Sequence, residues 1–249
     1  HRMTPLVGRD GEIALLLQRW ASAKNGSRQV ILVCGEAGVG KSRLVYTLKA
    51  RLTPDPHILM PCRCSPLHTQ SALYPIIGLL EHFLRLAPED PPDRKLNTLE
   101  NTLRQHHLNL EETVPFLAVL LSIPLPADRY PLILSPEMQK KQTFKAVLTL
   151  LFTLSSQQPV LLIVEDIHWI DPSTMELLTL LVEQRTSARL YTLLTYRPLF
   201  VPPWTSSLGL TQITLIHLSP NQARLMIHSM ANDKALPAEV IQQIVMATN

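Results

Sequence analysis

Apolar residues along this chain fall into two alternating patterns, short unbroken runs and helical repeats. The unbroken runs carry few charges, which is typical of strands that are buried on both faces of a sheet. Segments with helical spacing lie between most of these runs, and this alternation predicts a parallel α/β sheet with helical crossovers. The predicted strands cover residues 29–34, 57–62, 159–164, 190–196 and 212–218.

Helical patterns divide the rest of the chain into further units. Ile13 and Trp20 lie on the apolar face of a helix that precedes the first predicted strand. Leucine-rich helical pieces separated by proline-bearing turns extend from about residue 75 to residue 155, and we interpret them as a helical insertion. The last part of the chain contains helical patterns only. The predicted domains are residues 1–218, which form the α/β unit, and residues 219–249, which form a truncated helical domain.

A glycine cluster follows the first predicted strand directly, in the run GEAGVGKS. It fits the pattern G-x-x-x-x-G-K-[ST] between a strand and a helix, which is the context of a phosphate-binding loop. Backbone N–H groups in such a loop surround phosphate oxygens, and the helix N-terminus adds positive potential. We expect Lys41 to reach the outer phosphates and Ser42 to coordinate Mg²⁺. The predicted nucleotide-contacting residues here are Gly35, Glu36, Ala37, Gly38, Val39, Gly40, Lys41, Ser42 and Arg43.

Two adjacent acids, Glu165 and Asp166, follow the third predicted strand. In parallel α/β sheets ligands bind at the carboxyl ends of the strands, so we expect both carboxylates at the edge that carries the phosphate-binding loop. Phosphoryl transfer needs one acid near the Mg²⁺ and another that orients the attacking water. The register favours Glu165 for the metal and Asp166 for the water, and the reverse assignment remains open.

One basic residue, Arg197, follows the fourth predicted strand at the same edge of the sheet. We predict that it senses the terminal phosphate, although a strand-end arginine is also an ordinary surface cation. His168 and Trp169 come directly after the two acids. A histidine at this place fits local packing as well as it fits nucleotide contact, and the tryptophan fits the core.

Composition narrows the functional classes. A formal net charge of +3, spread evenly, and an aromatic content of 5% argue against nucleic-acid binding by this segment. No apolar run approaches the roughly 18 residues of a spanning helix, so we predict no membrane insertion. The odd number of cysteines, 3, favours a reducing compartment, which predicts a cytoplasmic location. Cys62, Cys64, His57 and His68 lack the paired spacing of a zinc site, and we interpret the cysteines as ordinary thiols.

Four segments, LVGRD, GEAGVGKS, VLLIVEDIHWIDPST and LLTYRP, together resemble the STAND class of signal-transduction ATPases, relatives of the AAA+ ATPases. The resemblance spans most of the chain. It is strongest to bacterial ATPase modules that accompany class III adenylate or guanylate cyclase domains or belong to large multidomain transcription regulators.

This resemblance implies a P-loop NTPase fold with sheet order 5-1-4-3-2, followed by a helical lid. It places Val7, Gly8 and Arg9 beside the adenine and ribose, and makes Arg197 the sensor on the fourth strand. It also implies a switch in which ADP holds a closed form and ATP favours an open form that assembles. The output domain, a cyclase or a transcription regulator, and helical repeats would lie outside these residues.

The leading hypothesis is therefore a regulatory ATPase that binds ATP with Mg²⁺ and hydrolyses it slowly to ADP and phosphate. Lys41, Glu165, Asp166 and Arg197 would be its catalytic residues, with Ser42, Glu165 and Asp166 at the metal. The alternative is a scaffold that holds ADP or ATP without turnover. Glu165 stands where many relatives carry Asp, and no glycine-x-proline lid element precedes Asn249. A GTPase is disfavoured because no N-K-x-D motif occurs.

Overall fold

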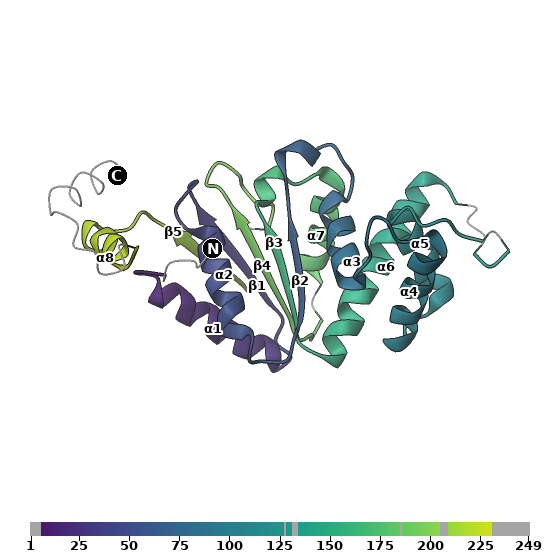
Figure 1. Cartoon of the computed structure of the whole chain (residues 1–249), viewed down its shortest axis with the longest axis horizontal. Coiled ribbons are helices and arrows are strands. Elements are labelled where there is room, and N and C mark those ends of the chain that lie inside the picture. The colour runs from purple at the N-terminus through teal and green to yellow at the C-terminus, as the bar shows by residue number, and fades with distance from the viewer. Residues whose placement is uncertain (1–5, 127, 131–133, 185, 205–208, 231–249) are drawn as a thin grey trace.

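The computed structural model describes residues 6–126, 128–130, 134–184, 186–204 and 209–230. In this part of the chain a five-stranded sheet has the order β2-β3-β4-β1-β5, and all its neighbouring strands pair in parallel. Read from its other edge, this is the predicted order 5-1-4-3-2, so the P-loop NTPase fold is confirmed. Helices cover both faces of the sheet (Figure 1).

The strands lie close to their predicted positions. Their bounds are β1 Gln29–Gly35, β2 Ile58–Arg63, β3 Val160–Glu165, β4 Leu190–Tyr196 and β5 Leu210–Leu215. The prediction placed the last strand too late, because Leu215 pairs with Gly35, where the partner strand ends. Ile216, which the prediction included, is 71% exposed. An apolar residue beyond the end of its partner strand therefore does not extend the sheet.

Alternating side chains of the central strands enter two separate hydrophobic cores, as the period of two in a strand requires. Ile31 and Leu193 pack with helices α1 (Asp10–Lys24) and α2 (Lys41–Leu52) on one face. Leu32 and Leu194 pack on the other face with the helices that follow β2 and β3. The sheet is thus the middle layer of three.

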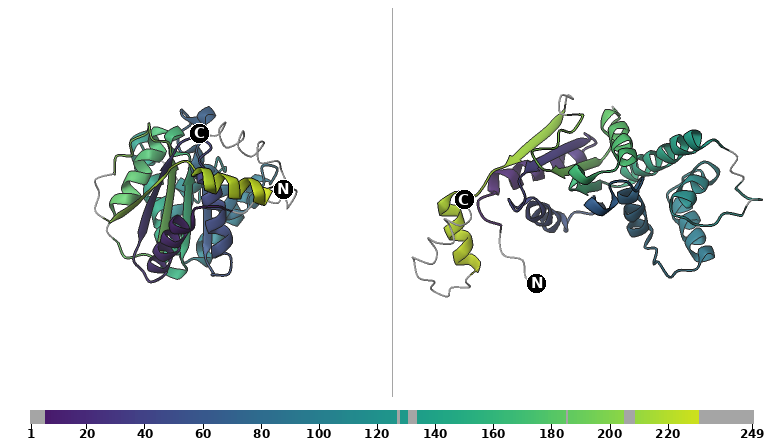
Figure 2. Two further views of the ribbon diagram at one scale, coloured as in Figure 1. Left: turned by 90° about the vertical axis from the view of Figure 1, so that its left-hand side faces the viewer. Right: turned by 90° about the horizontal axis from the view of Figure 1, so that it is seen from above.

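Helices extend the molecule on both sides of the sheet. Between β2 and β3 lie α3 (Tyr74–Leu84), α4 (Pro92–Gln105), α5 (Leu110–Leu120) and α6 (Pro136–Gln157), and α7 (Pro172–Glu183) follows β3. Figure 2 shows α4 and α5 at one end of the molecule and α8 (Pro220–Met230) at the opposite end. The later part of the predicted small helical domain, residues 231–249, lies outside the described residues. Within the described ranges, no helix has the length and apolar character needed to cross a membrane.

Two short 3-10 helices lie at the carboxyl edge of the sheet. One covers Pro66–His68 after β2, and the other covers Ile167–Trp169 directly after the two acids. Both therefore belong to the edge at which the phosphate-binding loop also lies.

Candidate functional site

The glycine-rich loop connects β1 to α2 in the conformation that its glycines permit. Gly38 has a φ of 80° and Gly40 a φ of 105°, in the left-handed region that strains other residues. Gly40 also accepts the first bond of the helix, from the N–H of Leu44 at 2.9 Å. The N-terminus of α2, with its unpaired N–H groups, is therefore directed at the space beside the loop.

Gly35 is required for a different reason, which is lack of space. A Cβ atom at this position would lie 2.7 Å from Cγ1 of Val39 and 3.2 Å from Cβ of Leu215. The loop therefore folds back closely onto the ends of β1 and β5. This contact holds the loop against the rigid sheet.

The ammonium group of Lys41 is bound by the loop itself. Its Nζ donates hydrogen bonds to the carbonyl oxygens of Gly35, at 2.7 Å, and Glu36, at 2.8 Å. Lys41 is only 8% exposed, and burial lowers the pKa of its ammonium, while the charge of Asp166 acts in the opposite direction. Both carbonyl bonds are interactions that oxygens of a bound phosphate could replace.

The two acids after β3 have different surroundings. Asp166 has a φ of 60°, and its N–H donates to Oγ1 of Thr195 at 3.0 Å. Its Oδ2 accepts a hydrogen bond from Nε of Arg63 at 2.9 Å and forms an ion pair with Nη2 of the same guanidinium at 2.8 Å. The half-buried carboxylate of Glu165 has no hydrogen bond or ion pair with any residue that the structure describes. One acid is thus paired and the other is free to bind a ligand.

Arg63 and Thr195 belong to this site, although the sequence analysis did not identify them. Arg63 ends β2, and it pairs in register with Glu165 on β3. Thr195 lies one residue before the end of β4 and is 1% exposed. Their positions in the sequence were the signal that could have identified them, since each residue lies at the carboxyl end of a predicted strand.

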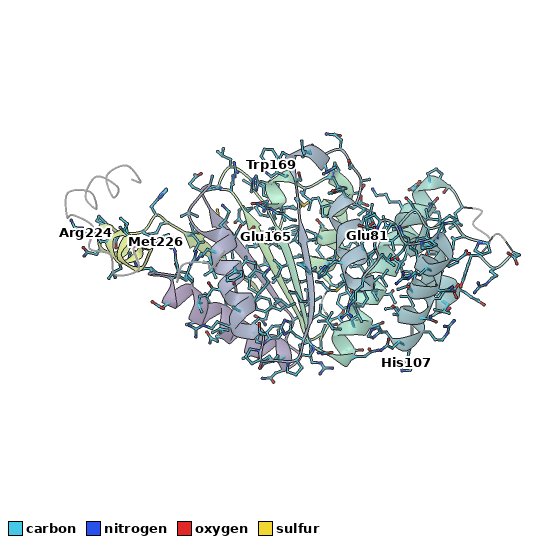
Figure 3. All side chains as sticks on the ribbon, in the orientation of Figure 1. Glu81, His107, Glu165, Trp169, Arg224 and Met226 are labelled. Atoms are coloured by element: carbon cyan, nitrogen blue, oxygen red, sulfur yellow. The ribbon has the colours of Figure 1, made fainter. Side chains whose placement is uncertain are left out.

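Arg197 and His168 lie at the same edge. The guanidinium carbon of Arg197 is 5.9 Å from the centre of the Trp169 ring, which Figure 3 labels above the sheet. Burial lowers the pKa of His168, Asp166 raises it, and Arg197 and Lys41 lower it further. Both ring nitrogens of His168 are buried without a hydrogen-bond partner among the described residues. The four charged or titratable side chains are therefore close enough to influence one another.

The segment before α1 contacts the phosphate-binding loop. Arg9 is 6% exposed and donates hydrogen bonds to the carbonyl oxygens of Val39, at 3.4 Å, and Ile216, and to Glu12 at 3.0 Å. Gly8, with a φ of 68°, accepts a bond from Nε2 of Gln222 in α8 at 3.3 Å. Val7 is half-buried beside them. This segment thus connects the loop, the end of β5 and the first turn of α8.

The available donors are suited to a small hard cation rather than to zinc. The hydroxyl of Ser42 is exposed at the first turn of α2, and Glu165 offers an unpaired carboxylate. Mg²⁺ binds such oxygens together with phosphate oxygens and water. By contrast, the described ranges hold no group of three His, Cys, Asp or Glu residues that could bind a metal ion alone. Cys34, Cys62 and Cys64 are free thiols.

Comparison with known proteins identifies a family for most of this chain. Residues 5–195 match the protein family described as AAA ATPase domain. An uncharacterized protein of Rhizobium meliloti (strain 1021) is 27% identical over 226 residues, which make up 90% of this chain and 21% of that protein. This chain thus spans about a fifth of the length of that relative.

Solved structures with a similar fold have low sequence identity. The Walker-type ATPase of Pyrococcus abyssi is 16% identical with a TM-score of 0.52, covering 97% of this chain and 63% of that one. The Aeropyrum pernix ORC1 protein, solved with DNA, is 16% identical with a TM-score of 0.51, covering 98% of this chain and 56% of that one. A chain of the E. coli HORMA:CdnC:Trip13 complex is 12% identical with a TM-score of 0.54, covering 97% and 73%. These likenesses concern the fold.

Proposed function

This chain belongs to the AAA ATPase domain family, whose members are nucleotide-binding ATPases, and we propose that it is a regulatory member that hydrolyses ATP slowly to ADP and phosphate. The observation that carries this proposal is the convergence of Lys41, Glu165, Asp166 and Arg197 at one edge of the sheet. They come from three places in the chain, the start of α2, the end of β3 and the end of β4, which parallel pairing brings to one edge.

The roles of the side chains follow from their surroundings. Lys41 exchanges its bonds to the loop carbonyls for bonds to the outer phosphates, and the loop N–H groups bind the remaining oxygens. Asp166 holds the attacking water once its carboxylate leaves Arg63. Arg197 is exposed beside Trp169 and is free to reach the terminal phosphate. Catalysis of this kind depends on positioning and charge neutralisation.

Ser42 and Glu165 would hold Mg²⁺, with Asp166 near its outer shell. When bound, Mg²⁺ neutralises charge that develops on the phosphate oxygens. The unpaired carboxylate of Glu165 supports its assignment to the metal, and the bonds of Asp166 to Arg63 support its assignment to the water.

We assign the nucleotide-dependent switch to the segment from Val7 to Arg9. Arg9 joins the phosphate-binding loop to Ile216, which directly precedes the linker into α8. A change in the loop on loss of the terminal phosphate would therefore act on α8. This assignment treats residues 1–218 as the P-loop domain, with a helical insertion at about 75–155, and residues 219–249 as the start of a lid over the adenine.

For the whole protein we propose a signal-transduction ATPase of the STAND class, located in the cytoplasm. This chain spans about a fifth of its Rhizobium relative, which leaves room in such a protein for an output domain, a cyclase or a transcription regulator, and for helical repeats. Self-assembly would accompany ATP binding. Nucleic-acid binding by this segment is not part of the proposal, because its net charge is only +3.

A non-hydrolysing scaffold that holds ADP or ATP is the second candidate. The observation that favours it is the pairing of Asp166 with Arg63, since a carboxylate held there does not orient water. Both candidates bind adenine nucleotide, so the distinction between them is turnover.

The test combines nucleotide extraction from the purified protein with ATPase assays on the wild type, Lys41→Ala and Asp166→Asn. We expect adenine nucleotide to be recovered, and slow hydrolysis that Lys41→Ala abolishes and Asp166→Asn greatly reduces. Lys145→Ala is the control, because this exposed lysine lies on α6 and pairs with Glu112 on the adjacent α5, away from the phosphate-binding loop. Recovered guanine nucleotide, or turnover that survives Lys41→Ala, would overturn the proposal. Bound adenine nucleotide without turnover in the wild type would establish the scaffold.

A further inference from the structure

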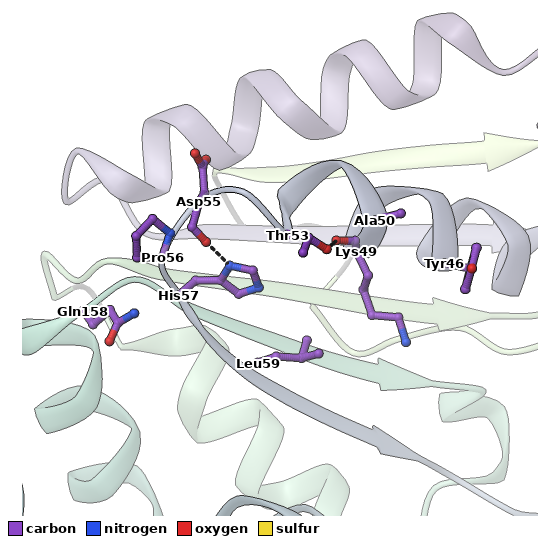
Figure 4. A pocket seen from close by; sticks show the side chains of 9 residues that line it. All are labelled: Tyr46, Lys49, Ala50, Thr53, Asp55, Pro56, His57, Leu59 and Gln158. Atoms are coloured by element: carbon purple, nitrogen blue, oxygen red, sulfur yellow. Dashed lines mark hydrogen bonds between the residues drawn. The ribbon is translucent and has the colours of Figure 1, made fainter.

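A cavity lies far from the phosphate-binding loop, at the opposite end of α2. It has a volume of about 600 Å³, within the range of small-molecule sites. Its walls are the last turns of α2 and the start of β2, and Gln158 closes one side (Figure 4). Because α2 runs from the carboxyl edge of the sheet to its amino edge, this cavity is separate from the nucleotide site.

The cavity contains a positive charge that is not paired with any acid in the part of the chain that the structure describes. In Figure 4 the side chain of Lys49 extends from α2 toward β2, on the side where Leu59 lies. Its ammonium group has no hydrogen bond or ion pair with any residue in the described ranges. Lys24 on the neighbouring helix α1 differs, since it is paired with Asp55 at 2.6 Å.

The one acid that lines the cavity is directed out of it. Oδ2 of Asp55 accepts bonds from Nε1 of Trp20, at 2.9 Å, and from Lys24, and both donors belong to α1. Only the backbone carbonyl of Asp55 faces the His57 ring (Figure 4). The acid therefore does not compete with a ligand for Lys49.

His57 is fixed in one tautomer by the same turn. Its Nδ1 lies 2.7 Å from the carbonyl oxygen of Asp55, and because a carbonyl only accepts, Nδ1 carries the hydrogen. The ring is also held edge-on against Trp20, at 5.4 Å between centres. Nε2 of this tautomer only accepts, so the side-chain amide of Gln158 is the hydrogen-bond donor that remains beside it for an anionic ligand. Neither group has a hydrogen-bond partner among the described residues.

The remaining walls are apolar or aromatic. Leu59 is half-buried on β2, Ala50 is exposed on α2, and the ring of Tyr46 is 46% exposed at the rim. A ligand that contacts both Lys49 and these apolar side chains needs a negatively charged group and an apolar body.

We propose that this cavity binds a small organic anion, a carboxylate or phosphate ester with an aromatic or aliphatic body. Lys49 pairs with the anionic group, the Gln158 amide donates a hydrogen bond to it, and the apolar body covers Leu59 and Ala50. Charge-assisted bonds to a lysine are the largest polar contribution at such a site. The site does not depend on nucleotide hydrolysis, so it stands or falls separately from the proposed ATPase activity.

The test is a titration of the whole protein with benzoate and, separately, with phenyl phosphate, followed through the ring resonances of His57 in NMR spectra. A His57→Gln variant assigns these resonances. We expect saturable shifts with dissociation constants in the millimolar range for at least one probe, and the stronger probe identifies the anionic group. Lys49→Gln should weaken binding at least fivefold, Lys49→Arg should retain it, and Lys41→Ala should leave it unchanged for benzoate.

Lys145→Gln is the matched control, since it removes one exposed helical lysine elsewhere. Thermal unfolding of each variant verifies that it is folded. The proposal is overturned if neither probe gives saturable shifts, if Lys49→Gln binds as tightly as the wild type, or if Lys41→Ala abolishes benzoate binding, because the probe would then occupy the phosphate-binding loop.

Discussion

Replacing Arg63 with glutamine tests whether this residue restrains Asp166. The substitution removes the guanidinium group that forms a hydrogen bond and an ion pair with Oδ2 of Asp166, and it keeps a polar side chain at the end of β2. If Asp166 orients the attacking water, its carboxylate must leave Arg63 before hydrolysis. We therefore expect Arg63→Gln to increase the kcat for ATP.

The structure sets the size of this effect. The Arg63 side chain is 68% exposed and that of Asp166 is 17% exposed, so solvent screens the pair. Exposed ion pairs contribute about 0–1 kcal/mol, and 1 kcal/mol of barrier corresponds to about fivefold in rate. The increase in kcat should therefore be no more than about fivefold, and the free energy of unfolding should change by less than about 1 kcal/mol.

The assay measures steady-state ATP hydrolysis at saturating ATP, together with urea unfolding. Arg94→Gln is a close control, because Arg94 forms a similar exposed pair with Asp90, with side chains 71% and 11% exposed. It lies on α4, away from the nucleotide site, and should leave kcat unchanged. Added salt weakens exposed pairs and should bring the wild-type kcat closer to that of Arg63→Gln.

A decrease in kcat for Arg63→Gln would refute this reasoning, because Arg63 would then assist hydrolysis directly. An unchanged kcat would also refute it, because the ion pair would then not restrain Asp166 during ATP hydrolysis. Because kcat is measured at saturating ATP at each salt concentration, a change in ATP affinity does not produce these outcomes.

Two further predictions concern stability. Asp171 is 1% exposed, and its carboxylate accepts hydrogen bonds from the N–H of Thr174 at 2.9 Å and of Leu73 at 3.0 Å. Asp171→Ala should therefore lower the free energy of unfolding in urea by about 2–4 kcal/mol. Asp171→Asn keeps an acceptor and should lower it by clearly less. Burial raises the pKa of Cys64 and of Tyr196 to about 12, above the ordinary values of 9.0 and 10.0. As the pH rises, the unfolded chain therefore loses these protons before the folded chain does. The free energy of unfolding should fall by up to about 1.4 kcal/mol per pH unit for each group between about pH 9 and about pH 12. Equal urea midpoints at about pH 8 and about pH 10.5 would contradict this prediction.

Local patterns in the sequence predicted most of the fold. The unbroken apolar runs that became β1, β3 and β4 end within about one residue of their predicted bounds, because a strand buried on both faces has a clear signal. The edge strands β2 and β5 were displaced by one to three residues, since half-exposed strands carry a weaker pattern. Whether the predicted site residues bind nucleotide stays a prediction.

Local sequence is enough to predict the phosphate-binding loop and the position of the two acids after a buried strand, because steric demands on glycine and the direction of a strand act over a few residues. The contact of Arg63 with Asp166, 103 residues away, depends instead on the tertiary fold, and so does the hydrogen bond from Asp166 to Thr195. These contacts arise because β2 and β4 are the two neighbours of β3, and neighbour order depends on how helical crossovers pack on the sheet. The cavity at Lys49 has the same origin, since α2 and β2 meet there only in the folded chain.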